Sequence, residues 1–163
     1  MILYIEESII RFKLPKSKDF CKEEIVMKIP ESIKKIFIED KAVAFGTATA
    51  DGIPNINMIG IKKLLDDETI VLADNYFNKT FNNIKNNNKG TILTKRAEEK
   101  LWYQLKGTYT YINEGPKYEE LKKWAKSVWK PAPARGMLIF KVENIFNCIS
   151  GPNAGNLIDE EMQ

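Results

Sequence analysis

The sequence predicts a mainly β protein, a small closed or partly closed antiparallel barrel with helices inserted between its strands. Three observations support this prediction. About six apolar segments have the length or alternation of strands, hairpin-type turns join most of them, and a few other segments carry apolar residues at helical spacing. Strands do not alternate regularly with helices, so the pattern is not that of a parallel βαβ sheet.

The first elements are a helix over 30–40 and a hairpin of two strands over 42–50 and 53–64. Asp51-Gly52 between these strands is a strong signal for a two-residue hairpin turn. Segment 42–50 is small and apolar without a helical stripe, which favours a buried strand. The helix begins with a proline, and its apolar residues recur three or four positions apart: Ile29, Ile33, Ile36 and Phe37.

The later segments continue the pattern. A switch to helical spacing follows the third strand, and prolines stop the last helix. In chain order we expect a strand over 69–73, a helix over 76–87, strands over 90–95 and 101–113, a helix from Pro116 to Pro131, and a last strand over 136–149 bent at Glu143-Asn144.

The length of 163 residues predicts one domain with a substantial core. Residues 29–163 form this predicted domain, and residues 1–28 form an N-terminal extension of different composition. This extension is either an added strand with a linker or a loosely packed segment, and the sequence does not decide between them.

Composition excludes several classes of function. Lys+Arg 25 against Asp+Glu 22 gives a net charge of only +3, and few of the basic residues are Arg, so nucleic-acid binding is not expected. The absence of His excludes His-based catalytic triads and His-ligated zinc or haem. The two cysteines lack metal-site spacing. No apolar run reaches the ~20 residues of a membrane helix, and no basic signal-peptide start is present, so we expect a cytoplasmic protein without a membrane segment.

Two segments are candidates for ligand binding. Asn78, Lys79 and Thr80 open the helix predicted over 76–87, where free N–H groups, a cation and a hydroxyl suit a phosphate. The alternative is a capped, solvated helix end. The strand 55–63 carries two amides on one face, and Gly60 permits close approach of a ligand. The alternative is an edge strand with polar residues facing water. Aromatic residues in the second half of the chain form either a pocket for a flat ring or core and dimer contacts.

These pieces, in this order, resemble the flavin-binding split-barrel superfamily that includes pyridoxamine 5'-phosphate oxidase. The resemblance covers about Pro30 to Gly155. It rests first on FGTATADGIPNINMIGIKKL, with its DG hairpin and return strand ending in Lys62. It rests also on IVLADNYFNKTFNNIKNN, in which Asn78-Lys79-Thr80 match the family's phosphate-binding residues at the start of a helix, here called the phosphate step. It implies a six-stranded antiparallel split β-barrel and a homodimer with FMN at the subunit interface.

The resemblance also implies a set of FMN-binding residues. Four side chains are expected to contact the phosphate, and a stretch of β-strand backbone is expected to run along the flavin ring and ribityl chain. The phosphate set is Lys62, Asn78, Lys79 and Thr80; the ring set is Asn57, Met58, Ile59 and Gly60. Asp74 and Asn75 precede the phosphate step, and Trp102 stands where some members place a flavin-contacting Gln.

Departures from the family pattern make some activities of the family unexpected for this chain. The oxidase holds its substrate with Arg and His near its C-terminus, whereas this chain has no His and only Arg135 in its last third. Asn57 also stands where the oxidase has Arg. Oxidation of pyridoxamine phosphate and haem degradation are therefore not expected. The closer resemblance is to the flavoredoxin-like or uncharacterised branch, which implies an FMN-dependent oxidoreductase of unknown substrate. A non-enzymatic flavin carrier, a deazaflavin (F420)-binding reductase, and a sensor without cofactor remain alternatives.

Overall fold

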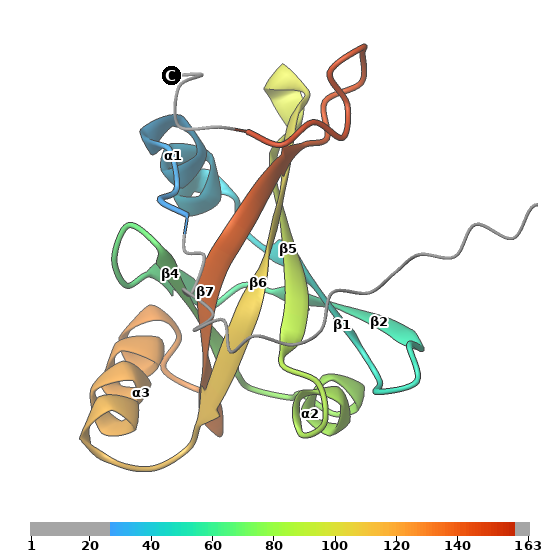
Figure 1. Cartoon of the computed structure of the whole chain (residues 1–163). Helices are drawn as coiled ribbons and strands as arrows, with labels where there is room; N and C mark the ends of the chain where they lie inside the picture. Colours follow the sequence, from blue (N-terminus) through green and yellow to red (C-terminus); the bar gives the residue numbers. More distant parts are fainter. Residues whose placement is uncertain (1–26, 159–163) are drawn as a thin grey trace, which may run out of the picture.

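A computed structural model describes residues 27–158, and their strands form a single curled antiparallel sheet (Figure 1). The expected extension over 1–28 lies almost entirely outside the described residues. The order of strands across the sheet is β2-β1-β5-β6-β7-β4-β3. The strands are β1 (Val43–Ala48), β2 (Pro54–Ile59), β3 (Lys62–Leu64), β4 (Thr69–Asp74), β5 (Lys89–Arg96), β6 (Leu101–Ile112) and β7 (Gly136–Asn147).

Three α-helices interrupt the sheet at the predicted places, so the predicted fold class is confirmed. Figure 1 shows α1 and α2 at opposite ends of the long strands β5, β6 and β7. The helices are α1 (Glu31–Glu39), α2 (Lys79–Ile84) and α3 (Pro116–Val128), and a short 3-10 helix, η1 (Ala97–Glu99), joins β5 to β6. No helix of the described residues is long and apolar enough to cross a membrane.

The segment 53–64, predicted as one strand, is two strands, which is why the sheet has seven strands rather than six. β2 pairs with β1, whereas β3 pairs with β4 at the other edge of the sheet. Gly60 and Ile61 make the crossing between them, and the Ile61 carbonyl accepts a hydrogen bond from the Ala73 N–H at 3.0 Å. Burial of Ile61 under α3 holds this crossing in place.

The helix predicted over 76–87 is also shorter than expected, because α2 starts only at Lys79. The residues between β4 and α2 form a loop instead. The Asp74 carboxylate accepts a hydrogen bond from the Phe77 N–H at 2.7 Å, which holds this loop in place.

Two apolar clusters stabilise the fold. One fills the concave side of the sheet beneath α1, where Phe45 makes edge-to-face ring contacts with Tyr109 and Phe140. The second lies between the sheet and α3 and includes Leu121 and Ala125 of that helix. Burial of these side chains is the main stabilising contribution.

The predicted bend in the last strand is confirmed as a β-bulge. Lys106 pairs with Asn144, but Gly107 pairs with Val142, so Glu143 has no partner across the ladder. A Cβ at Gly107 would lie 1.8 Å from the Lys141 carbonyl oxygen, so only glycine fits beside this bulge.

We expect the ionisation of Tyr109 to lower the stability of the protein at alkaline pH. Its hydroxyl donates to the Asn87 carbonyl at 2.6 Å, and burial raises its pKa from 10 to about 12. The unfolded chain therefore ionises first, and the free energy of unfolding falls as pH rises from 10 towards 12, by about 1.4 kcal/mol at pH 11. Urea unfolding at pH 9, 10 and 11 should show a steeper decline for the wild type than for Tyr109→Phe. Parallel declines would contradict the assignment.

Candidate functional site

A cavity of about 230 Å³ lies beside edge strand β2. β2 forms one wall, the loop after β4 forms another, and the end of α3 contributes the third. Its lining residues are Asn57, Met58, Ile59, Gly60, Ile61, Ala73, Asn75, Tyr76, Phe77 and Trp129. Apolar and aromatic walls with two amides are typical of sites for small molecules. All four predicted ring-contacting residues, and Asn75 with them, line this cavity.

The first turn of α2 is fastened to β2 by buried polar groups. The Thr80 side chain is 0% exposed, and its hydroxyl oxygen accepts hydrogen bonds from the amides of Asn55 at 2.9 Å and Asn57 at 2.8 Å. A third amide, that of Asn83, donates to the Thr47 hydroxyl at 3.0 Å. The two strand amides therefore face α2 and are paired there, which is what burial of an amide requires.

Asn78 and Lys79 remain exposed at the start of α2. Asn78 occupies the N-cap position but makes no side-chain capping bond. Lys79 has no carboxylate partner within residues 27–158. Both follow directly on Phe77, which lines the cavity, so an amide and a lysine without a carboxylate partner in the described residues come next in the chain after its wall.

The Asp74 carboxylate stabilises the loop after β4, which forms one wall of the cavity. It is 1% exposed, and beyond the Phe77 N–H it accepts hydrogen bonds from Arg135 at 3.1 Å and from the Tyr111 hydroxyl at 2.8 Å. Burial, with the bond to this carboxylate, raises the pKa of Tyr111, so its hydroxyl stays a donor at neutral pH. The hydrogen bonds of the Asp74 side chain are to Phe77, Tyr111 and Arg135, so this residue positions the loop that carries Asn75.

Asn75 has one contact of its own in this region. Its side-chain oxygen accepts a hydrogen bond from the Ala134 N–H at 3.1 Å, across from the loop that ends α3. The bond connects the loop after β4 to the residues that precede β7.

Two predicted residues lie away from this group. The Lys62 ammonium donates to the Phe37 carbonyl in the last turn of α1 and lies 4.2 Å from the centre of the Phe37 ring. Burial lowers the pKa of Lys62. Trp102 is the second residue of β6, and the centre of its ring lies 5.2 Å from the Lys95 ammonium. Their predicted contacts with the cofactor stay predictions.

Three aromatic residues of the cavity were not among the predicted site residues. Tyr76 and Phe77 sit in the segment predicted as helix, where they would have been assigned to a helix face. Trp129 belongs to the aromatic residues in the second half of the chain, for which the sequence leaves a pocket and core or dimer contacts as alternatives. The stop at Pro131 was the available signal, because it places Trp129 at the C-cap of α3, where the helix ends against the cavity.

The profile of the pyridoxamine 5'-phosphate oxidase family matches residues 29–148. This span is most of the chain and contains the whole cavity. The chain belongs to this family. Membership agrees with the resemblance drawn from the β-hairpin and phosphate-step motifs.

Individual proteins are similar to this chain in sequence and in fold. An uncharacterized protein of Methanocaldococcus jannaschii is 37% identical over 141 residues, which are 83% of this chain and 91% of that protein. The crystal structure of Group A Streptococcus HupZ is 34% identical, with a TM-score of 0.67, and covers 78% of this chain and 99% of its own. An FMN-binding protein from Syntrophomonas wolfei shares the fold at 22% identity, with a TM-score of 0.60 over 69% of this chain and 80% of its own.

Proposed function

We propose that this family member binds FMN in the cavity beside β2 and acts as an FMN-dependent oxidoreductase. One observation carries the proposal: the cavity along Asn57–Ile61 is also lined by Phe77, and the exposed Asn78 and Lys79 follow Phe77 directly in the chain, at the start of α2. A flat ring and a phosphate are the two parts of FMN, and this arrangement offers a place for each in the order expected. The FMN-binding protein that shares the fold supports the choice of cofactor.

The residues present fit the ring of this cofactor. Met58, Ile59, Phe77 and Trp129 give apolar and aromatic walls. β2 pairs with another strand on one side only, so N–H and C=O groups along its free edge remain for the ring's polar atoms. A Cβ built at Gly60 would meet nothing closer than the Lys41 carbonyl oxygen at 3.7 Å, so the backbone there is open to close approach.

The phosphate end fits as well. Lys79 brings a full positive charge, and the Asn78 amide is free to donate, because neither side chain is engaged elsewhere in the described part of the chain. Thr80 would contribute through its backbone N–H, since its hydroxyl already accepts two amides. A phosphate dianion here would be held by charge-assisted hydrogen bonds.

When bound, FMN supplies the redox chemistry itself. The chain's own residues have three tasks. The aromatic and apolar walls exclude water from the ring, the backbone of 57–60 orients it, and Asn78-Lys79 anchors the phosphate. No side chain of the cavity is required as nucleophile or general base, which is consistent with a chain that contains no His.

The proposal includes a homodimer with the cofactor at the subunit interface. Large apolar side chains of and beside β2 are exposed to solvent, with Ile56 71% and Met58 60% exposed. Trp129 at the cavity is 43% exposed. An exposed apolar surface of this kind is typical of an interaction site. Light scattering coupled to gel filtration should give twice the chain mass of 18.7 kDa; a monomer with bound FMN would contradict this part.

The direct test of the cofactor is the absorption spectrum of the purified protein, followed by mass spectrometry of the acid-released chromophore. One FMN per chain is expected. A deazaflavin mass would replace FMN with F420, and a protein that neither carries nor takes up FMN would overturn the proposal. Steady-state turnover with NAD(P)H then separates an enzyme from a flavin carrier, because a carrier is reduced without sustained turnover.

Reversing the charge of the phosphate step should release the cofactor. Lys79→Glu removes a charge-assisted hydrogen bond of about 1.5–3 kcal/mol and adds repulsion, so the affinity for FMN should fall by at least about tenfold to a hundredfold. Flavin fluorescence quenching measures the Kd. The matched control is Lys123→Glu on the exposed side of α3, which should bind FMN as the wild type does. Equal affinities in the two variants would remove Lys79 from the site.

A further inference from the structure

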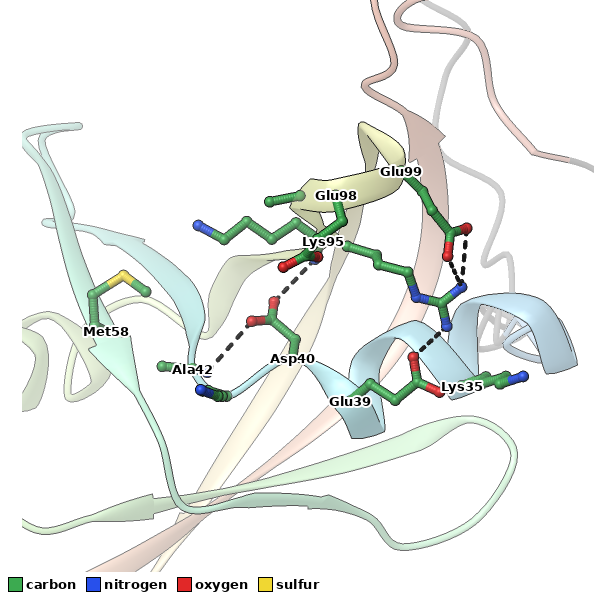
Figure 2. A pocket seen from close by; sticks show the side chains of 11 residues that line it. Lys35, Glu39, Asp40, Ala42, Met58, Lys95, Glu98 and Glu99 are labelled. Carbon is green, nitrogen blue, oxygen red and sulfur yellow. Dashed lines mark hydrogen bonds and ion pairs between the residues drawn. The ribbon is translucent and has the colours of Figure 1, made fainter.

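A second cavity, of about 770 Å³, adjoins the proposed flavin site at Met58. The end of α1 and the residues after it form one wall, and the end of β5 with η1 forms another. Figure 2 shows Met58 on one side of this cavity and Glu39 and Glu99 on the far side, with Asp40, Lys95 and Glu98 between them. Met58 lines both cavities, so the two cavities adjoin at this residue.

Most carboxylates of this larger cavity are already engaged. Arg96 forms ion pairs with Glu39 of α1 and with Glu99 of η1, the latter at 3.2 Å. Asp40 accepts hydrogen bonds from the Lys95 N–H at 2.9 Å and the Ala42 N–H at 3.4 Å (Figure 2). These bonds join α1 to the β5–η1 turn and hold the two walls of the cavity at a fixed separation.

The lysines of the cavity are free by comparison. Lys35 and Lys41 make no ion pair or side-chain hydrogen bond with any residue that the structure describes. Lys95 lies over the Trp102 ring and has no carboxylate partner in the same part of the chain. Of the four lining carboxylates, Glu98 is the one left without a bond. The formal charges of the lining cancel, and the charged groups that make no hydrogen bond or ion pair in the described residues are the ammonium groups of Lys35, Lys41 and Lys95 and the Glu98 carboxylate.

We infer that the larger cavity is the substrate site and that its substrate is an organic anion carrying phosphate or carboxylate groups. The inference rests on the proposed function, because it takes the flavin ring to lie beyond Met58. The anionic end contacts Lys35, Lys41 and Lys95, and the reacting end lies against Met58. Lysines suit this task when the anion needs no fixed bidentate geometry, because each ammonium is a mobile point charge on a flexible stem.

The test is a titration of the full chain, with its cofactor if it retains one, with pyrophosphate and, separately, with citrate at constant ionic strength. Amide chemical shifts in ¹H–¹⁵N spectra report the site. We expect saturable shifts at Lys41-Ala42 and across 95–99. The probe that saturates at the lower concentration identifies the anionic group, phosphate or carboxylate.

Two double variants make the test specific. Lys41→Gln with Lys95→Gln should weaken binding by at least about tenfold. Lys123→Gln with Lys126→Gln removes two exposed lysines of α3 and should leave it unchanged. Shifts that do not saturate, or equal losses in both variants, overturn the inference, since they indicate general screening of surface charge.

The two proposals fail in different ways. A chain that binds FMN but gives no saturable shifts for either anion loses its assigned substrate site and keeps its cofactor. A chain that binds the anions through Lys41 and Lys95 but takes up no flavin supports an anion site and overturns the proposed function.

Discussion

Replacing Asp74 by Ala should cost about 2–5 kcal/mol of the free energy of unfolding. The carboxylate is buried and serves three donors at once: the Arg135 guanidinium, the Tyr111 hydroxyl and the Phe77 N–H. Removing it leaves the buried Phe77 N–H and the partly buried Tyr111 hydroxyl unpaired, and each unpaired donor carries a desolvation penalty; the Arg135 guanidinium is half exposed and adds less. Chemical denaturation followed by circular dichroism measures the loss.

The matched control for this prediction is Asp66→Asn. Asp66 is an exposed carboxylate in the turn before β4, where it accepts one backbone N–H at 2.9 Å, so its loss should cost less than about 1 kcal/mol. Should Asp74→Ala not fold, Asp74→Asn keeps the shape and tests the charge alone. A cost for Asp74→Ala no larger than that of Asp66→Asn would show that the cluster contributes little.

Asp74 also links stability to the cavity. It fixes the turn that presents Asn75, Tyr76 and Phe77, and these residues form one wall of the proposed flavin site. Affinity for FMN should therefore fall in Asp74→Asn although this side chain makes no contact with the ring. Such a loss, with the fold intact, identifies a positioning residue.

Local signals account for most of the fold. Asp51-Gly52 predicted the β1–β2 hairpin, and Gly52 has the positive φ of 91° that favours glycine in such a turn. The apolar spacing after Pro30 predicted α1, and the polar pair Glu143-Asn144 marked the bulge in β7. In each case the residues that determine the element lie within it, so a short window of sequence is sufficient.

The predicted strand and helix boundaries are wrong where residues far away in the sequence take part in the structure. Nothing between Ile53 and Leu64 signals that β2 and β3 pair with different strands, because that choice is made by β1 and β4. α2 starts only after a loop whose Asp74 carboxylate binds Arg135, a residue 61 positions away in the chain.

The same distinction applies to the candidate site. Its contiguous pieces, Asn57–Gly60 and Asn78–Thr80, were visible as motifs, and the fold brings them together through Thr80. Trp129 comes from α3, and only the packing of that helix places it beside β2. The hydrogen bond from Lys62 to α1 could not be predicted from the sequence either, because its acceptor is a backbone carbonyl of that helix.

Thr80→Val should separate the two halves of the site. Valine matches threonine in shape but has no hydroxyl, so the Asn57 amide loses its acceptor and the Asn55 amide keeps only the Thr47 hydroxyl at 3.5 Å, in a partly buried place. At about 1–3 kcal/mol for an unpaired donor, the free energy of unfolding should fall by about 1–4 kcal/mol. Denaturant unfolding gives the loss, and the side-chain amide signals of Asn55 and Asn57 in ¹H–¹⁵N spectra should shift.

The control is Thr80→Ser, which keeps the hydroxyl and should retain most of the stability and both amide signals. Because α2 carries Asn78 and Lys79, loosening it from β2 should also weaken FMN binding in Thr80→Val more than in Thr80→Ser. Equal affinity in the two variants would mean that the phosphate step keeps its place without the Thr80 bonds. The ring slot and the anion step would then be independent parts of the site, joined only by residues 74–78 rather than by the buried polar cluster.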